Sequence, residues 1–174
     1  VNYVFSGTHG IAGSALLLKS SSGKVTFTNP NSYTGVTTIA GGILELGNGG
    51  TSGNLGSGPI VNNATLQLNR SDDVVFTQSI SGNGALVKLG SGKATITTVQ
   101  GATGATTVSA GTLALANFSG SSSYSIASGA TTEFNVTVLT RNMPAATFTG
   151  DGTIVKSGAG DLYWGGAATF NLGS

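Results

Sequence analysis

The sequence contains no cysteine, only 3 prolines and few charged residues. Asp, Glu, Lys and Arg make up 7% of its 174 residues, against about 25% in an average soluble domain. Without disulfide bonds, the stability of the chain must come from repetition or from a long shared core. A net charge of +1 provides no positive field for nucleic acid, so nucleic acid is not an expected partner.

Long apolar runs are also missing. No uninterrupted apolar run exceeds four residues, as in Ala15–Leu18, whereas a membrane-spanning helix needs about 20. Membrane insertion of this segment is therefore not expected, and no secretion signal is recognised, so any such signal is expected outside the segment. Disorder is not expected either, because hydrophobic residues reach 39% while charge is low. A folded, weakly charged, extracellular β-protein is the class that remains.

Short segments separated by glycine recur at a fixed long offset. Lys24–Thr28 resembles Lys93–Thr97 (93 − 24 = 69), and Thr37–Leu46 resembles Thr106–Leu115 (106 − 37 = 69). A third element ends on a lysine and occurs three times: Ile11–Lys19, Ile80–Lys88 and Phe148–Lys156. The sequence therefore predicts one continuous domain over residues 1–174, built from units 11–79 and 80–147 and the beginning of a third at 148–174.

The pattern inside each unit predicts strands. Polar and apolar residues alternate in Val25–Thr28 and Thr112–Leu115, and glycine is too frequent for helices. A closed barrel or sandwich gives each strand different surroundings, whereas a solenoid repeats them, so the long repeat favours a β-solenoid. A 69-residue unit fits about three coils of roughly 23 residues, a common length for a three-faced parallel β-helix.

Stacked coils would place apolar residues of successive units in common ladders. The predicted ladders are Ile11, Ile80 and Phe148; Leu17, Leu86 and Ile154; and, on another face, Leu44, Leu46, Leu113 and Leu115. Each buried aliphatic side chain would stabilise the fold by about 1.5–3 kcal/mol. The glycine clusters Gly47–Gly50 and Gly90–Gly92 are predicted at corners, where the backbone needs positive φ or close approach.

The first unit contains three motifs in a characteristic order. A lysine-bearing segment, Leu18–Thr28, is followed by Asn31–Ile39 with the pattern Asn-x-Tyr-x-Gly, and then by Gly42–Gly47. Together these segments resemble the autotransporter-associated β-strand repeat. The second unit keeps Leu86–Lys88 but has Gln100–Gly104 in place of the Asn-x-Tyr-x-Gly pattern.

The third unit keeps Ile154–Gly160 and departs from the repeat at Asp161–Trp164. The resemblance implies a right-handed parallel β-helix in the passenger region of a bacterial protein exported by type V secretion. In that family the repeat is associated with passenger stability and export, and the β-helix acts as a stalk.

Few side chains offer catalytic chemistry. His9 has no Asp or Glu nearby in sequence and is predicted to be a surface-loop residue. The cluster Arg70–Asp73 is the densest group of ionisable residues and suits a polysaccharide lyase or glycosidase. However, adjacent strand residues point to opposite faces, so Asp72 and Asp73 would converge only on a loop. A solvated turn without a catalytic role is the favoured interpretation. The other acidic residues are scattered: Glu45, Glu133, Asp151 and Asp161. No catalytic residue, metal ligand or cofactor is predicted.

Three further patterns are weaker signals of function. Thr26 and Thr28 recur only as Thr95 and Thr97, whereas an ice-binding face would need such a pair in every coil. The adjacent aromatic residues Tyr163–Trp164 suit either a sugar-stacking platform or packing at the end of the core. Four Asn-x-Ser/Thr sequons begin at Asn63, Asn69, Asn117 and Asn135, a number close to what composition alone produces.

The expected function is a non-enzymatic stalk or adhesive segment of an extracellular or bacterial cell-surface protein. A carbohydrate-active β-helix enzyme is the alternative, followed by an ice-binding β-solenoid. Expected partners are a second copy at the open ends of the coil, and a glycan or protein ligand on a host or other surface. The sequence does not identify the residues that would bind such a ligand.

Overall fold

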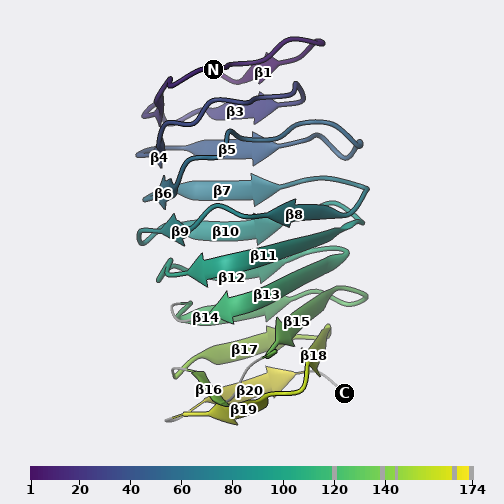
Figure 1. Cartoon of the computed structure of the whole chain (residues 1–174). Helices are drawn as coiled ribbons and strands as arrows, with labels where there is room; N and C mark the ends of the chain where they lie inside the picture. The colour runs from purple at the N-terminus through teal and green to yellow at the C-terminus, as the bar shows by residue number, and fades with distance from the viewer. Residues whose placement is uncertain (119–120, 138–139, 144, 166–167, 173–174) are drawn as a thin grey trace.

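The computed structural model describes residues 1–118, 121–137, 140–143, 145–165 and 168–172, and all regular elements in these ranges are β-strands (Figure 1). No helix long and apolar enough to cross a membrane occurs in the described residues. The absence of helices there agrees with the prediction from glycine frequency.

Two large sheets and one strand pair contain all the strands. Sheet 1 consists, in spatial order, of β1 (Tyr3–Phe5), β3 (Lys24–Phe27), β5 (Ile43–Leu46), β7 (Thr65–Leu68), β10 (Ala85–Lys88), β12 (Thr106–Val108), β14 (Ser123–Ile126), β17 (Thr147–Gly150) and β20 (Thr169–Leu172). Sheet 2 consists of β2 (Leu17–Lys19), β4 (Thr37–Ile39), β6 (Ile60–Asn62), β9 (Ile80–Ser81), β11 (Lys93–Gln100), β13 (Thr112–Phe118), β15 (Thr131–Asn135) and β18 (Thr153–Ser157), with β8 (Val74–Phe76) beside β11. The separate pair is β16 (Thr140–Met143) with β19 (Asp161–Trp164).

Every strand pair is parallel, and the chain forms a coil of about eight turns. The sequence offset between register partners in sheet 1 varies from turn to turn. It is smallest between Thr106 and Tyr124 (124 − 106 = 18) and largest between Tyr124 and Phe148 (148 − 124 = 24). Figure 1 shows the turns stacked from the N-terminus at the top to the C-terminus at the lower right. The predicted parallel β-solenoid is confirmed.

The core lies between the two sheets and is built by strand alternation. Leu44, Leu66 and Leu86 are in register on β5, β7 and β10, and each is at most 1% exposed. Toward the C-terminus the same column becomes aromatic: the rings of Tyr124 and Phe148 stack with centroids 5.0 Å apart. Each aliphatic residue of such a column stabilises the fold by about 1.5–3 kcal/mol.

One repeat unit is longer than three turns. Three turns in register from Leu17 lead through Thr37 and Ile60 to Ile80 (80 − 17 = 63). The residue equivalent to Leu17 in the next unit is Leu86 (86 − 17 = 69), which lies one strand further along, on β10 of sheet 1. A unit therefore advances by three turns plus one strand.

This advance makes the predicted ladders wrong. Leu17 and Ile154 lie in sheet 2 but Leu86 lies in sheet 1, and Ile80 and Phe148 are likewise in different sheets. The stacks predicted to share one face are also divided: Leu44 and Leu46 belong to β5 of sheet 1, whereas Leu113 and Leu115 belong to β13 of sheet 2. A unit thus covers slightly more than the roughly three coils predicted, because most turns are shorter than the length of about 23 residues assumed from the sequence.

The predicted glycine corners are confirmed, with both of the expected causes. Gly47 has φ +76°, a conformation that side chains rarely adopt. Gly90 has no positive φ, but a Cβ atom there would lie 2.0 Å from the carbonyl oxygen of Arg70 in the preceding turn. Close stacking of backbone on backbone therefore requires glycine at the second corner.

Candidate functional site

The lysines of the repeats join neighbouring turns. Lys19 ends β2 and Lys88 ends β10, and these residues are only 4% and 1% exposed. The Lys19 Nζ donates to the carbonyl of Ser21 at its own corner and to the carbonyl of Gly41, one turn on, at 2.8 Å. A buried ammonium that satisfies carbonyls from two successive corners fastens one turn to the next.

Lys88 forms the same arrangement one unit later. Its Nζ donates to the carbonyl of Gly90 and, at 3.2 Å, to the carbonyl of Ala110. Burial lowers the pKa of Lys88 from its usual value, and the charge of Asp73 opposes this in part. In the third unit the Nζ of the exposed Lys156 donates to the carbonyl of Gly158 at 2.6 Å. We call Lys19 and Lys88 the lysine clamps.

Asn31, from the Asn-x-Tyr-x-Gly pattern, links three turns. Its Oδ1 accepts a hydrogen bond from the Ile11 backbone N–H in the preceding turn at 2.9 Å. Its Nδ2 donates to the carbonyl of Asn54 in the following turn at 2.8 Å, and the Asn54 amide donates back to the carbonyl of Asn31 at 3.0 Å. The asparagine therefore acts as a side-chain extension of the backbone ladder.

Tyr33 and Gly35 of the same pattern are structural as well. Tyr33 is fully buried, its hydroxyl lies 2.7 Å from Thr37 Oγ1, and burial raises its pKa. In the second unit Ala102 stands at this position, and Thr106 instead shares a hydrogen bond with Ser121 at 2.7 Å. A Cβ atom on Gly35 would lie 2.2 Å from the carbonyl oxygen of Ala15, so only glycine fits.

Glu45 is the most buried acid of the chain, with 4% of its side chain exposed. Its carboxylate accepts hydrogen bonds from Thr26 at 2.9 Å and Asn69 at 2.9 Å, and Lys24 Nζ lies 2.8 Å away. Burial acts to raise the pKa of Glu45, but the bonds from Lys24, Asn69 and Thr26 outweigh it, so the pKa lies below its usual value. This carboxylate binds neighbouring strands together and is not available as a proton donor at neutral pH.

Glu133 holds a comparable place in sheet 2. The Nζ of Lys93 lies 2.6 Å from its carboxylate, and Ser157 Oγ donates to it at 2.5 Å. The bond from Lys93, followed by that from Ser157, lowers the pKa of Glu133. Asp151 and Asp161, the remaining scattered acids, are exposed.

The Arg70–Asp73 cluster forms a turn, as predicted, and its two acids have different partners. Arg70 donates to both carboxylate oxygens of Asp72, from Nε at 2.7 Å and from Nη2 at 2.6 Å, which lowers the pKa of Asp72. Asp73 Oδ1 accepts from the backbone N–H of Lys93 at 2.8 Å. Asp72 is therefore paired with a cation of its own turn, whereas Asp73 is bound to the first backbone N–H of β11 in the next turn.

The other candidate residues fall in structural or exposed places. His9 is exposed, and its ring Nδ1 lies 3.2 Å from the hydroxyl of the neighbouring Thr8. Thr26 is in register with Glu45 rather than with another threonine, so these positions present no flat threonine array. No group of three or more His, Asp or Glu side chains that could hold a metal occurs in the described part of the chain.

Of the two adjacent aromatic residues, Trp164 packs at the end of the core. Its ring meets those of Phe148 and Phe170 edge to face, with centroids 5.2 and 5.0 Å apart. Tyr163 is 56% exposed. Packing at the end of the core, one of the two predicted roles, is therefore observed for Trp164.

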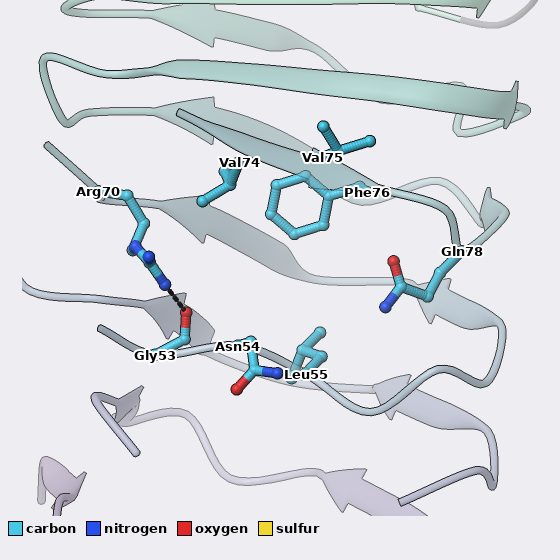
Figure 2. A pocket seen from close by; sticks show the side chains of 8 residues that line it. All are labelled: Gly53, Asn54, Leu55, Arg70, Val74, Val75, Phe76 and Gln78. Atoms are coloured by element: carbon cyan, nitrogen blue, oxygen red, sulfur yellow. Dashed lines mark hydrogen bonds between the residues drawn. The ribbon is translucent and has the colours of Figure 1, made fainter. Parts of the chain in front are cut away.

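A cavity of about 210 Å³, which the sequence did not predict, interrupts the surface between two turns (Figure 2). Its walls are residues Gly53–Leu55 of the turn that contains β5, and Arg70, β8 and Gln78 of the turn that contains β7. The only sequence signal was the run Val74–Phe76, which is apolar throughout instead of alternating. We call this feature the β8 gap.

Two side chains form hydrogen bonds across the β8 gap. Between most other neighbouring turns, backbone N–H and C=O groups make these bonds. Arg70 Nη1 donates to the carbonyl of Gly53 at 2.6 Å, as drawn in Figure 2, and Gln78 Nε2 donates to the carbonyl of Gly56 at 2.6 Å. Among the strands of the described residues, β8 pairs with β11 alone. The Oε1 atom of Gln78 is buried without a hydrogen-bond partner.

Comparison with known proteins gives two matches. Residues 17–46 and 86–115 each match the Passenger-associated-transport-repeat family. The first stretch contains β2–β5, the second runs from within β10 to within β13, and each includes one lysine clamp.

A stretch of 83 residues, 48% of this chain, is 46% identical to the Adhesin BmaC autotransporter of Brucella suis biovar 1 (strain 1330). The match spans 2% of that protein's length. No solved structure gives a significant match.

Proposed function

We propose that this chain, which is an autotransporter passenger segment carrying two passenger-associated transport repeats, serves as a stalk on the bacterial cell surface. Eight stacked turns rise by roughly 38 Å at about 4.8 Å per turn. We take the coil to be right-handed, since connections between parallel strands of one sheet usually are. Parallel ladders between turns resist bending and would hold an attached binding element away from the membrane.

The observation that carries the proposal is the use of the repeated side chains. Lys19, Lys88 and Tyr33 are buried and bind groups within the coil. Glu45, a buried acid, also binds neighbouring strands. The residues that define the repeat therefore serve cohesion between turns, which is what a stalk requires.

Amide hydrogen exchange followed by NMR tests the stalk. The amides of β5, β7, β10 and β12, in the central turns, should exchange only through global unfolding, while those of the first and last turns exchange earlier. Central amides that exchange as fast as terminal ones would mean that the turns open independently and would contradict a rigid stalk.

We propose further that the segment is not an enzyme. The two acids of its densest ionisable cluster bind different partners, which supports this view. Asp72 is paired with Arg70, and Asp73 accepts a hydrogen bond from the backbone N–H of Lys93. Incubation with plant, algal and host polysaccharides should show no bond cleavage or elimination. Turnover that disappears in an Asp72→Asn/Asp73→Asn protein would establish the carbohydrate-active alternative instead.

A second copy is the proposed partner at the ends of the coil. Tyr3 and Phe5 on β1 are 58% and 47% exposed, and Phe170 on β20, at the other end of sheet 1, is 44% exposed. Edge strands with apolar side chains favour head-to-tail pairing. Sedimentation velocity should show association that rises with concentration and falls in a Tyr3→Lys protein. A monomer at millimolar concentration would contradict this partner.

A further inference from the structure

The β8 gap has the features of a binding site that the stalk role does not use. We propose that it docks an extended, uncharged peptide segment of another protein, which pairs with the free edge of β8. The proposal goes beyond the stalk role and stands or falls separately from it.

The backbone is the first argument. In a parallel sheet a strand uses alternate peptide groups for each of its two neighbours, so an interior strand has partners on both sides. β8 has β11 on one side only, and on its other side lies the cavity. The facing carbonyls of Gly53 and Gly56 are bound by the side chains of Arg70 and Gln78. The other edge of β8 is therefore open to a guest strand.

Hydrogen-bonding groups at the gap are the second argument. Because Gln78 Nε2 is held by the carbonyl of Gly56, its buried Oε1 is left as an acceptor without a donor. Arg70 uses three N–H groups for Asp72 and the carbonyl of Gly53, and a guanidinium has five. Figure 2 shows these two side chains at opposite ends of the gap. A peptide backbone, which carries both N–H and C=O groups, matches an acceptor and a donor spaced in this way.

Apolar contacts are the third argument. Leu55 and Phe76 are buried in the wall of the gap, and Val75 beside them is 64% exposed. All other large hydrophobic side chains that are exposed in the described residues belong to the segments 1–18 and 155–170 at the two ends of the chain. The gap therefore offers apolar side chains, as well as hydrogen-bonding groups, to a bound peptide.

The same features argue against other ligands. The charge of Arg70 is paired with Asp72, so the gap does not attract a phosphate or an acidic group. A sugar ring would need an exposed aromatic face, but Phe76, the only aromatic residue of the wall, is 7% exposed. The space of about 210 Å³ suits one apolar side chain of a strand.

NMR titration of the isotope-labelled chain tests the proposal. The probe is a capped heptapeptide of alternating threonine and valine, and a panel of glucose, galactose and N-acetylglucosamine forms the second arm. The peptide should shift the amides of residues 53–56 and of β8, while the sugars should not. No shift at millimolar peptide, or the same shifts with a sugar, would overturn the proposal.

Backbone methylation separates strand pairing from simple apolar contact. Two versions of the peptide carry N-methyl groups on the odd or on the even residues. Because a strand uses alternate N–H groups toward one neighbour, one version should bind at least about tenfold more weakly than the other. Equal affinities would show that the backbone is not paired, and the proposal would fail. This test needs no change to the protein.

A matched pair of variants locates the site. Val75→Lys places a charge beside the open edge of β8 and should weaken peptide binding about tenfold. Val155→Lys is the same change at an exposed valine of β18, outside the gap, and should leave affinity unchanged. Urea unfolding of both proteins shows whether they fold equally well. Equal loss of affinity in the two folded variants would place the peptide elsewhere.

Discussion

At the scale of single residues, charged side chains make up only 7% of the chain, yet several of them are buried in the coil. Lys88 stands in a core column between Leu68 and Val108, and it is 1% exposed. Burying an ammonium is costly unless its donors find partners, and here two corner carbonyls accept hydrogen bonds from it. The recurring lysine is therefore an internal tie between turns.

Replacing this tie should destabilise the coil. Lys88→Met fills much of the same space but leaves the carbonyls of Gly90 and Ala110 without their donor, so the free energy of unfolding should fall by about 1–3 kcal/mol. Lys156→Met, at the exposed lysine of the third unit, should change it by no more than about 0.5 kcal/mol. Urea denaturation followed by circular dichroism measures both. Equal stability of the Lys88→Met and unsubstituted proteins would refute the tie.

Glu45 should make stability depend on pH in the acid range. Its pKa in the folded protein lies below that of the unfolded chain, so the unfolded chain binds protons more readily. The stabilisation is present above the unfolded value of about 4.3 and is lost as pH falls toward the folded value. Glu45→Gln should therefore be less stable at pH 7 but lose less stability between pH 6 and 3. Parallel pH curves for the two proteins would contradict this assignment.

At the scale of elements, the corners decide how closely successive turns can stack. Gly111 has φ +64°, and a Cβ atom there would lie 2.6 Å from each of the carbonyl oxygens of Gly90, Ser91 and Gly92. Gly129 also has positive φ, +77°, but nothing lies within 4 Å of its Cβ position. The two glycines share a backbone conformation and differ in the space around them.

This contrast separates the two reasons for glycine at a corner. Gly129→Ala should lower the free energy of unfolding by about 1–2 kcal/mol, the cost of left-handed backbone alone. Gly111→Ala adds a clash with three carbonyls and should cost about 3 kcal/mol or more. Thermal and urea unfolding of both variants measure the difference. If the two substitutions cost the same, close stacking at this corner would not be limiting.

At the scale of the whole molecule, the advance of three turns plus one strand places equivalent residues of successive units on different sheets. Leu17 belongs to sheet 2 and Leu86 to sheet 1, although their surroundings in sequence are alike. The lysine clamps therefore lie at different corners of the coil. Successive repeats fasten it from more than one side, which suits a stalk that must resist bending in more than one direction.

Removing one unit should leave a folded coil in which the remaining strands change sheets. Deleting residues 37–105 joins Val36 to Thr106, so that Thr107 takes the place of Thr38 beside Leu18. Neighbouring strands lie about 4.8 Å apart, within the range that a disulfide spans. A Leu18→Cys/Thr107→Cys pair should therefore form a disulfide in the shortened protein but not in the full chain.

The absence of native cysteine makes this experiment simple to interpret. In the full chain, Leu18→Cys/Thr38→Cys is the positive control, because these residues are in register on β2 and β4. Non-reducing electrophoresis after mild oxidation and mass spectrometry detect the bond. If the shortened protein forms no disulfide while this control forms one, the change of sheets would be contradicted.

The sequence by itself determined the kind of fold and the places where the chain turns. Parallel stacked coils could be predicted from two features: alternation in segments such as Val25–Thr28 and the recurrence of whole units. Segments with similar sequences adopt similar local structures, and a solenoid provides such repeated positions. Glycine clusters such as Gly47–Gly50 marked corners for the same local reason. The turn at Asp72 and Asp73 was also predicted, and it lies between β7 and β8.

Only the tertiary structure decided which residues share a ladder and where the coil is open. The number of residues in a turn depends on its corner segments, and it varies from turn to turn. These corner segments have no hydrophobic periodicity, so the sequence does not show how many residues each contains. A small difference in the length of each turn accumulates over a unit and moves Leu86 onto another strand than the one predicted. The β8 gap has the same origin, because the segment before β6 crosses opposite β8 without pairing with it.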